Sequence, residues 1–347
     1  MRALTVRVGI GLFTGQIPDG SGRTFAREYR ETLDLVRLAE SVGFDSAWVS
    51  EHHGASDGYL PSLLPMLAAL AASTERMQLG TGVVLAPFHD PLRLAEDAAV
   101  VDQLSGGRLI LGLGIGWRHE EFRMFGVPRP ERAIRTAETI DVLRRAWTGR
   151  RFSFEGRAFS YDRVKVTPPP AREGGIPIYL GGYADAAVRR AGRLADGYIT
   201  DAEAAEEVRP ILSMLDESAR SAGRDPRSLG IALIQNAFVA NDADAWEISR
   251  AGVAHQLGTY RAWEGTADTP EDDRLGPTPP DEETMRTWTP AGTPEEVHRA
   301  LRPLVEAFGD RELHLIVRLH YPGMDLGPAA RAVELFGREV LPPLRAG

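Results

Sequence analysis

The sequence alternates short β-rich runs with amphipathic helical stretches along almost its whole length. The eight runs that we predict as strands cover residues 6–12, 44–50, 77–86, 108–116, 176–182, 197–200, 229–240 and 312–320. Each is followed by apolar residues at helical spacing, as in Leu35, Leu38 and Val42 after the first run. Apolar strands that are joined by helices form a parallel sheet with helices on its faces.

Eight strand–helix units in 347 residues predict a closed (β/α)8 TIM barrel that forms a single domain over residues 1–347. A doubly wound open sheet is the alternative. Two stretches interrupt the alternation. Residues 151–167 alternate aromatic and charged side chains around Glu155-Gly156 and predict an inserted hairpin. Residues 264–292 are rich in Pro, Asp, Glu and Thr and predict a long, mobile, lid-like loop before the last strand.

Composition excludes several classes of function. The chain has no cysteine, so it has neither disulfides nor a thiolate nucleophile. Its net charge of −9 and pI of 5.5 argue against a nucleic-acid partner and against an anionic membrane surface. We find no signal peptide and no apolar run long enough for a membrane helix, so we expect a cytoplasmic protein with no membrane partner.

The second strand ends on the titratable sequence Glu51-His52-His53. In a TIM barrel the active site lies at the carboxyl ends of the strands. Alternation along the strand points Trp48 and His52 to one face and Glu51 to the other. We therefore expect His52 over the barrel mouth as a catalytic residue, with Glu51 and His53 as catalytic supports. A single histidine can also be an ordinary structural residue.

The same alternation in the last strand points Arg318 and His320 into the barrel. We predict that Trp48 and His320 contact the substrate. The barrel wall also contains aromatic side chains, among them Phe13 and Trp117, so an apolar or aromatic substrate is expected.

A metal site is the alternative for the same cluster, because two histidines and a carboxylate are suitable ligands for zinc or iron. Adjacent strand residues project to opposite faces, however, so Glu51, His52 and His53 do not readily share one ion. The sequence HEEF at 119–122 lacks the second histidine of a zincin helix. We predict no metal.

Two glycine motifs are suited to a flat or phosphorylated ligand. Gly181-Gly182 stands between a strand and a helix, where free backbone N–H groups attract phosphate, although an ordinary tight turn has the same sequence. Gly112, Gly114 and Gly116 alternate along one strand and leave space on one face.

The sequence EHH and the stretches 79–128 and 177–199 resemble the luciferase-like monooxygenase superfamily, the bacterial luciferase-like flavin-dependent oxidoreductases. The resemblance implies a TIM barrel with a flavin or deazaflavin at the strand ends. His52 matches the family's active-site histidine, and Gly82-Val83 matches a position that is often a cis peptide beneath the ring. Residues 264–292 fall where luciferase has a mobile loop.

The turn from Gly181 to Ala184 matches the family's phosphate-binding turn, but it has no Ser or Thr. Asp185 follows it directly, and Ile115 stands where luciferase has an arginine. The residues that we expect to bind the cofactor are Gly82, Val83, Gly114, Gly116, Trp117, Gly181, Gly182, Tyr183 and Ala184.

The function that the resemblance implies is a monooxygenase that uses reduced FMN and O2. The FMN is delivered by an NAD(P)H:flavin reductase, and a C4a-hydroperoxide oxygenates a small organic molecule. An F420-dependent hydride-transfer oxidoreductase and a non-catalytic flavin-binding subunit are the alternatives. Family members are often homodimers, and we expect helices near 60–74 and 92–104 to form such an interface.

Overall fold

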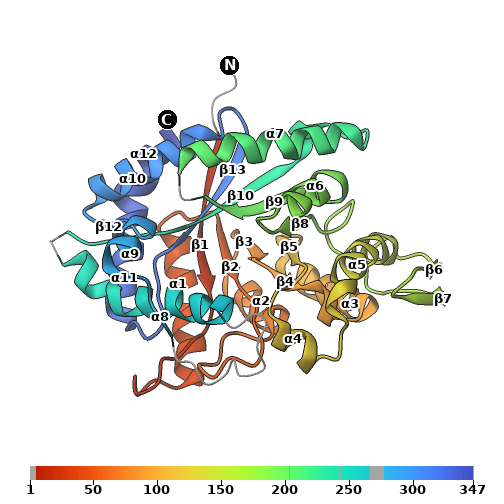
Figure 1. Cartoon of the computed structure of the whole chain (residues 1–347), viewed down its shortest axis with the longest axis horizontal. Coiled ribbons are helices and arrows are strands. Elements are labelled where there is room, and N and C mark those ends of the chain that lie inside the picture. The colour runs from red at the N-terminus through yellow and green to blue at the C-terminus, as the bar shows by residue number, and fades with distance from the viewer. Residues whose placement is uncertain (1–4, 203, 242–243, 266–276, 347) are drawn as a thin grey trace.

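A computed structural model describes residues 5–202, 204–241, 244–265 and 277–346 (Figure 1). Parallel strands form one sheet in the order β3-β2-β1-β13-β10-β9-β8-β5, and pairing of β3 with β5 closes it into a barrel. The strands are β1 (Thr5–Phe13), β2 (Ser46–Val49), β3 (Gln78–Thr81), β4 (Val84–Leu85), β5 (Leu109–Gly114), β8 (Ile178–Gly181), β9 (Gly197–Asp201), β10 (Gly230–Asn236) and β13 (Glu312–Arg318). The predicted (β/α)8 barrel is confirmed.

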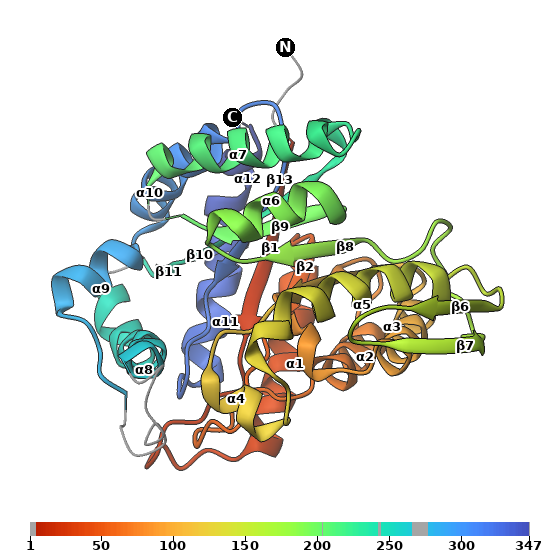
Figure 2. The ribbon, with the colours of Figure 1, turned by 45° about the vertical axis from the view of Figure 1, so that its right-hand side comes forward.

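Helices surround the barrel in both views (Figures 1 and 2). They are α1 (Phe25–Ser41), α2 (Leu63–Ser73), α3 (Pro91–Ser105), α4 (His119–Met124), α5 (Arg132–Ala146), α6 (Asp185–Leu194), α7 (Ala205–Ser221), α8 (Ala245–Gly265), α9 (Glu282–Trp288), α10 (Pro294–Ala307), α11 (Leu326–Leu335) and α12 (Leu341–Ala346). No described helix has the length and hydropathy that a membrane span requires.

Side-chain alternation divides the core into two parts. Leu313, Leu315 and Val317 of β13 lie in the large core between barrel and helices. Ile316 points the other way, into a smaller cluster inside the barrel that includes Trp48. Each strand is therefore apolar on both faces, as a helix-covered parallel sheet requires.

The predicted hairpin is present as β6 (Phe152–Glu155) paired antiparallel with β7 (Ser160–Val164), and it projects from the barrel beside α3 and α5 (Figure 2). The run 77–86 is interrupted between β3 and β4. The run 229–240 also divides, because β11 (Phe238–Val239) leaves the barrel to pair with β12 (Ala291–Gly292).

The stretch 264–292 differs from the single loop that its composition predicts. Residues 264–265 end α8, and α9 and β12 lie within 277–292. Asp281 caps α9 by accepting a hydrogen bond from the Thr284 amide at 2.9 Å, which explains why an acid-rich segment forms a helix here. Residues 266–276 lie outside the described residues.

Candidate active site

His52 lies just beyond β2, buried at the carboxyl end of the barrel. Its Nδ1 is 2.9 Å from Oε1 of Glu121, a completely buried residue of α4. The same carboxylate oxygen accepts a hydrogen bond from the His53 backbone amide at 3.0 Å. An ionised carboxylate can only accept, so this contact places a proton on Nδ1 and leaves Nε2 of His52 for a ligand.

Glu51 points away from His52, as alternation along the strand predicts. Its Oε1 contacts Nε2 of His53 at 2.8 Å and Nε2 of His89 at 3.1 Å. Burial by itself raises the pKa of Glu51, but these two histidines outweigh it and hold the pKa below its ordinary value. Burial opposes the charging of His89, yet the Glu51 carboxylate raises its pKa. Glu51 therefore fixes the loop that carries His53.

Aromatic rings surround the His52 imidazole. The ring of Tyr59 from the β2–α2 connection lies 4.8 Å away, centroid to centroid, and the ring of Trp263 from α8 is also at 4.8 Å. Tyr260 of α8 and Trp117 are at 5.6 and 6.1 Å. The carboxyl-terminal part of α8 thus packs over the barrel mouth and gives it an apolar, aromatic wall.

Hydroxyl groups of this wall form a buried cluster. The Tyr59 hydroxyl donates to Ser50 Oγ at 3.0 Å and lies 2.8 Å from the Tyr260 hydroxyl. Burial raises the pKa of Tyr59 well above its ordinary value, while the positive charge of Arg318 acts against this rise. Both phenols are therefore neutral hydrogen-bonding groups at neutral pH.

The Gly82–Val83 peptide bond is cis, the geometry that the resemblance implies at this position. The Val83 side chain lies against two glycines of neighbouring strands. A Cβ on Gly114 would stand 2.5 Å from Val83, and one on Gly181 would stand 2.9 Å from it. The glycines therefore make room for the Val83 side chain. Gly116 lies two residues beyond β5, has a positive φ of 69° and is next to the Phe122 ring.

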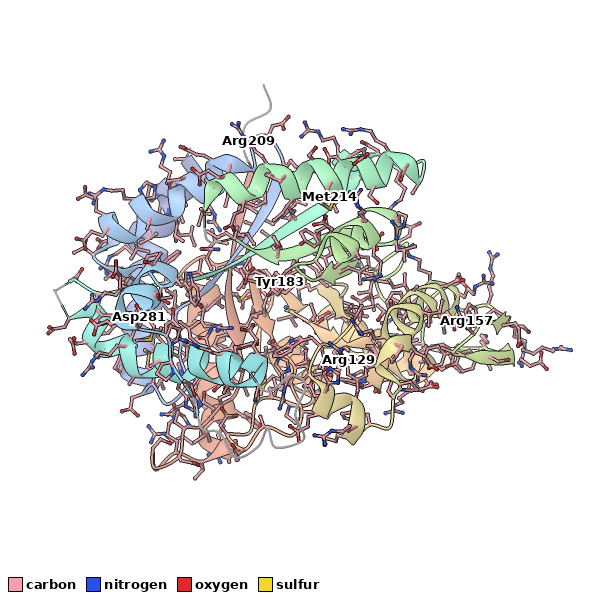
Figure 3. The ribbon with its side chains drawn as sticks, viewed as in Figure 1. Arg129, Arg157, Tyr183, Arg209, Met214 and Asp281 are labelled. Carbon is pink, nitrogen blue, oxygen red and sulfur yellow. The ribbon has the colours of Figure 1, made fainter. Side chains whose placement is uncertain are left out.

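The β8–α6 turn also depends on glycine. Gly182 has a φ of 144°, which other residues rarely adopt, and its carbonyl accepts a 2.6 Å hydrogen bond from the Tyr198 hydroxyl. Tyr183 is 71% exposed and projects over the middle of the molecule in Figure 3. Ala184 begins α6 without a side-chain cap. The first amides of α6 are thus open to an anion.

Three arginines on α6 and at or just before the start of α5 lie close enough to influence one another's pKa. Arg129 and Arg132 stand at the start of α5, and Arg190 belongs to α6. Burial and the neighbouring Arg129 lower the pKa of Arg132, and burial, Arg193 and Arg132 lower that of Arg190. Within the described residues these arginines form no ion pair with an acid. We name Arg129, Arg132 and Arg190 the arginine cluster.

The two residues expected at the substrate, Trp48 and His320, are both buried in the structure. Trp48 is fully buried inside the barrel, where its Nε1 donates to Ser46 Oγ at 2.8 Å. A Cβ on Gly80 would collide with its indole, so Trp48 fills the barrel as a core residue. His320 packs 6.2 Å from Phe13, with Nε2 3.8 Å from Glu28 of α1. Burial lowers its pKa, and we do not carry either residue into the proposed site.

Glu121, Tyr260 and Trp263 are the site residues that sequence reasoning missed. Glu121 belongs to HEEF, which we considered as a metal motif and as part of the stretch that resembles the luciferase-like superfamily, without giving Glu121 a role. Its position directly after a barrel strand was the usable signal, because such loops build the mouth. No sequence signal places α8 there. Among the residues that the structure describes, no group of three His, Asp or Glu side chains is arranged to hold a metal.

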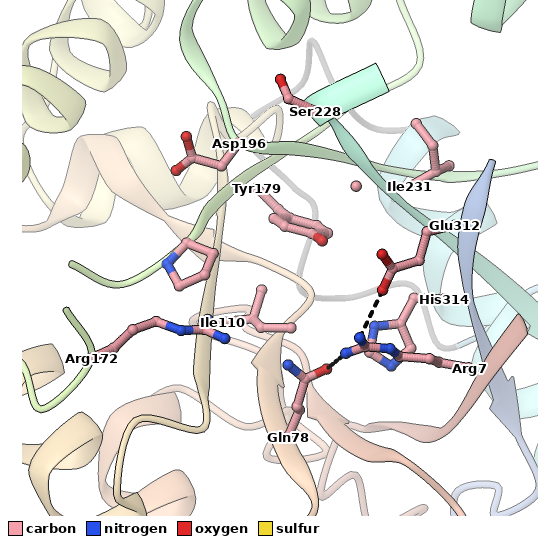
Figure 4. A pocket seen from close by; sticks show the side chains of 12 residues that line it. Arg7, Gln78, Ile110, Arg172, Tyr179, Asp196, Ser228, Ile231, Glu312 and His314 are labelled. Atoms are coloured by element: carbon pink, nitrogen blue, oxygen red, sulfur yellow. Dashed lines mark hydrogen bonds and ion pairs between the residues drawn. The ribbon is translucent and has the colours of Figure 1, made fainter. Parts of the chain in front are cut away.

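The opposite end of the barrel has a pocket of different character (Figure 4). There Arg7 pairs with Glu312 at 2.9 Å and donates to Gln78 at 3.0 Å. His314 bonds to Ser46 Oγ at 2.8 Å, and burial lowers its pKa to about 4. These polar groups partner one another.

Solved structures share this fold. A monooxygenase, RslO1, from Streptomyces bottropensis superposes with a TM-score of 0.81 at 27% identity, over 97% of this chain and 99% of that one. The F420-dependent tetrahydromethanopterin reductase of Methanopyrus kandleri gives a TM-score of 0.74 at 22% identity, over 99% of this chain and all of that one. The second likeness supports the fold alone.

Sequence comparison identifies the family as well as the fold. The F420-dependent glucose-6-phosphate dehydrogenase of Nakamurella multipartita is 32% identical over 91% of this chain and 93% of its own length. The family model for luciferase-like monooxygenases matches residues 6–311. Relatives of this kind are oxidoreductases, so the prediction of an oxidoreductase enzyme is confirmed at that level. The chain belongs to the luciferase-like monooxygenase family.

Proposed function

We propose that the chain is an oxidoreductase that binds the deazaflavin F420 and transfers hydride to or from a small organic molecule. The observation that carries this proposal is the identity of about one third, over nine tenths of the chain, to F420-dependent dehydrogenases. It moves our preference from reduced FMN to F420, which the sequence had offered as the alternative. An enzyme is favoured over the non-catalytic flavin-binding subunit because these relatives are enzymes.

The residues at the mouth fit such a cofactor. Val83 offers an apolar side chain beside Gly114 and Gly181, and the absence of Cβ atoms at those glycines leaves a flat surface. The open first turn of α6 and the arginine cluster supply N–H groups and positive charge for a phosphorylated, acidic tail. These arginines take the place of the Ser or Thr that the turn lacks. The negative charge of Asp185 makes this compensation necessary.

When bound, F420 supplies a ring that accepts or donates hydride. His52 performs the proton transfer. Its Nε2 takes the proton from a substrate hydroxyl, or returns it to a carbonyl, while Glu121 holds the imidazole in the required tautomer through Nδ1. The aromatic wall from α8 excludes water from the imidazole. Tyr59 and Tyr260 offer neutral hydroxyls that orient a polar substrate group.

The test compares the two cofactors directly. Titration of the purified chain with F420 and with FMN, followed by quenching of cofactor fluorescence, should give tighter binding of F420. Glu121→Gln should leave F420 affinity unchanged and lower turnover, because the amide can hold Nδ1 but does not stabilise a charged imidazole. Tight binding of FMN without binding of F420 would refute the proposal.

Reduced FMN monooxygenation is the second candidate function, and the likeness to the Streptomyces monooxygenase favours it. It requires a separate NAD(P)H:flavin reductase. The assay mixes the chain with FMN, such a reductase and NADPH, and measures O2 consumption. Consumption that rises with added organic substrate and produces an oxygenated product supports this function; product-free consumption counts against it.

We also propose a homodimer. The exposed face of α3 carries Val100 and Leu104, which are 45% and 56% exposed and would be covered by a second copy. Light scattering on the purified chain measures its mass. Leu104→Glu should shift the mass to that of a monomer, whereas a wild-type monomer would contradict the proposal.

A further inference from the structure

Arg318 is the last residue of β13 and lies inside the barrel at the end that carries His52. It pairs in register with Asn236 of β10. Two residues earlier, Ile316 belongs to the cluster that fills the barrel interior, so Arg318 also projects inward. Only 4% of the residue is exposed.

The Arg318 guanidinium has no hydrogen bond or ion pair with any described residue, and its Nε is enclosed without an acceptor. Two other buried arginines in the described part of the chain are different. Arg118 donates to the His53 carbonyl at 2.9 Å and pairs with Glu120. Arg311 pairs with Asp216 and the Pro226 carbonyl. A buried charge without a partner is strongly unfavourable, so the unpaired guanidinium of Arg318 requires an explanation.

Arg318 is connected to α8, the helix that carries Tyr260 and Trp263, through its register partner Asn236, whose Oδ1 lies 3.5 Å from Nε2 of Gln256 on α8. The positive charge of Arg318 opposes the effect of burial on the pKa of Tyr59 and of Tyr260. The rings of both tyrosines contact the His52 imidazole, at 4.8 and 5.6 Å. Tyr59 and Tyr260 are therefore shared neighbours of the guanidinium charge and of the imidazole ring.

The anion belongs to the substrate rather than to the cofactor's tail. The open turn before α6 and the arginine cluster lie at the end of β8, and two strands, β9 and β10, separate β8 from β13. The tail thus has its own positive site on another part of the rim. Arg118 also lies at the aromatic wall, 3.9 Å from the Trp263 ring centroid, but its charge is paired with Glu120, whereas that of Arg318 is not paired within the described residues.

We propose that Arg318 binds a carboxylate of the substrate, so that the enzyme acts on organic acids with an apolar or aromatic body. A planar guanidinium donates two parallel N–H groups to a carboxylate, which explains an arginine at this position. Tyr59, Tyr260 and Trp263 receive the apolar body. This inference rests on the proposed function for the reaction, but the binding step can be tested alone.

The experiment measures, by calorimetry on the full chain, the affinity for 3-phenylpropionate and for its uncharged amide, with and without F420. The acid should bind roughly ten- to a hundredfold more tightly, the range expected for a buried charge-assisted pair. Arg318→Met should remove this preference, and Arg318→Lys should restore only part of it. Arg7→Met, at the opposite end of the barrel, is the matched control and should keep it.

Thermal unfolding shows whether the variants are folded. Arg318→Met removes an unpaired buried charge, so its Tm should equal or exceed that of the wild type. The proposal is overturned if the wild type does not prefer the acid, if Arg318→Met keeps the preference, or if this variant loses F420 affinity instead. Binding of glucose 6-phosphate, but of no carboxylate, through Arg318 would also overturn it. An Arg318-dependent preference in a chain that binds neither F420 nor FMN supports the inference and refutes only the proposed function.

Discussion

The two ends of the barrel hold similar residue types in opposite arrangements. At the amino-terminal end Arg7 has both Glu312 and Gln78 as partners (Figure 4), and His314 bonds to Ser46 outside that view. At the carboxyl-terminal end Arg318 has no described partner, and Nε2 of His52 has no hydrogen bond among the described residues.

This difference distinguishes groups that stabilise the fold from groups that await a ligand. A buried polar group in a stable core satisfies its hydrogen bonds, because an unsatisfied one costs free energy. Chains tolerate that cost where a ligand or a reaction makes use of the group. The unpaired groups at the carboxyl-terminal end therefore mark the site, and histidines at the two ends should respond differently to substitution.

The largest difference is expected between His52 and His314. His52→Ala should lower turnover by about 10²- to 10⁴-fold, the usual contribution of a general acid or base, with little change in Tm. His314→Gln should keep turnover and lower the free energy of unfolding by about 1–3 kcal/mol, because Ser46 Oγ loses its bond to the imidazole and keeps only the one from Trp48. Steady-state kinetics and urea unfolding of both variants measure this. Equal turnover losses would mean that the two ends do not differ as described.

His314 also predicts a pH dependence of stability. Its pKa in the folded chain is about 4, below the ordinary value of 6.5. The unfolded chain therefore binds the proton first as the pH falls. This contribution to stability is fully present above pH 6.5 and is lost toward pH 4, by about 3 kcal/mol in total. Urea unfolding between these pH values should show a shallower slope for His314→Gln than for the wild type; parallel slopes would contradict the prediction.

Substitution of the arginine cluster, at the carboxyl-terminal end of the barrel, is expected to have a moderate effect on F420 affinity. Arg132→Glu with Arg190→Glu should weaken F420 binding about tenfold at low salt, and less at high salt, because salt screens charge interactions. Arg209→Glu on α7 is the control. It makes the same change of charge at one position on another side of the molecule in Figure 3. Fluorescence titration at two salt concentrations measures both. A loss that salt does not reduce would assign the effect to folding instead.

The smallest effect on the kinetic constants is expected for the aromatic wall around His52. Tyr260→Phe removes the 2.8 Å contact between the Tyr260 and Tyr59 hydroxyls. We expect a several-fold rise in KM, equivalent to about 1 kcal/mol, with kcat nearly unchanged. As the control, Tyr161→Phe on the hairpin removes a comparable hydrogen bond, from Tyr161 to Asp90 at the start of α3. It should change neither KM nor kcat. Loss of kcat with unchanged KM would instead give Tyr260 a role in the chemical step.

Much of the fold follows from local patterns. Alternation along the last strand predicted that Arg318 points into the barrel. The core clusters agree with this alternation, because Ile316 lies inside the barrel and Leu315 lies toward the helices. Spacing could not predict the interruption between β3 and β4, because both halves are apolar. It could not predict α9 either, since a capped helix of seven residues in an acidic segment resembles a loop in composition.

The candidate site was predicted only in part. His52 stands out in the sequence because titratable residues rarely follow one another at a strand end. Its partner Glu121 is 69 positions away, on a different strand–helix unit. Tyr260 and Trp263 come from α8, a helix whose sequence alone does not distinguish a wall of the mouth from an outer layer.

The sequence by itself determined the barrel, the inward direction of Arg318 and the candidate histidine, because burial of alternating residues is a local property of each strand. The tertiary structure decided which groups have partners. Glu121 meets His52, Glu51 holds His53 and His89, and the Arg318 guanidinium is left unpaired only once the barrel closes and α8 packs over its mouth. Pairing between distant elements depends on their positions in space, and no spacing along the chain specifies it.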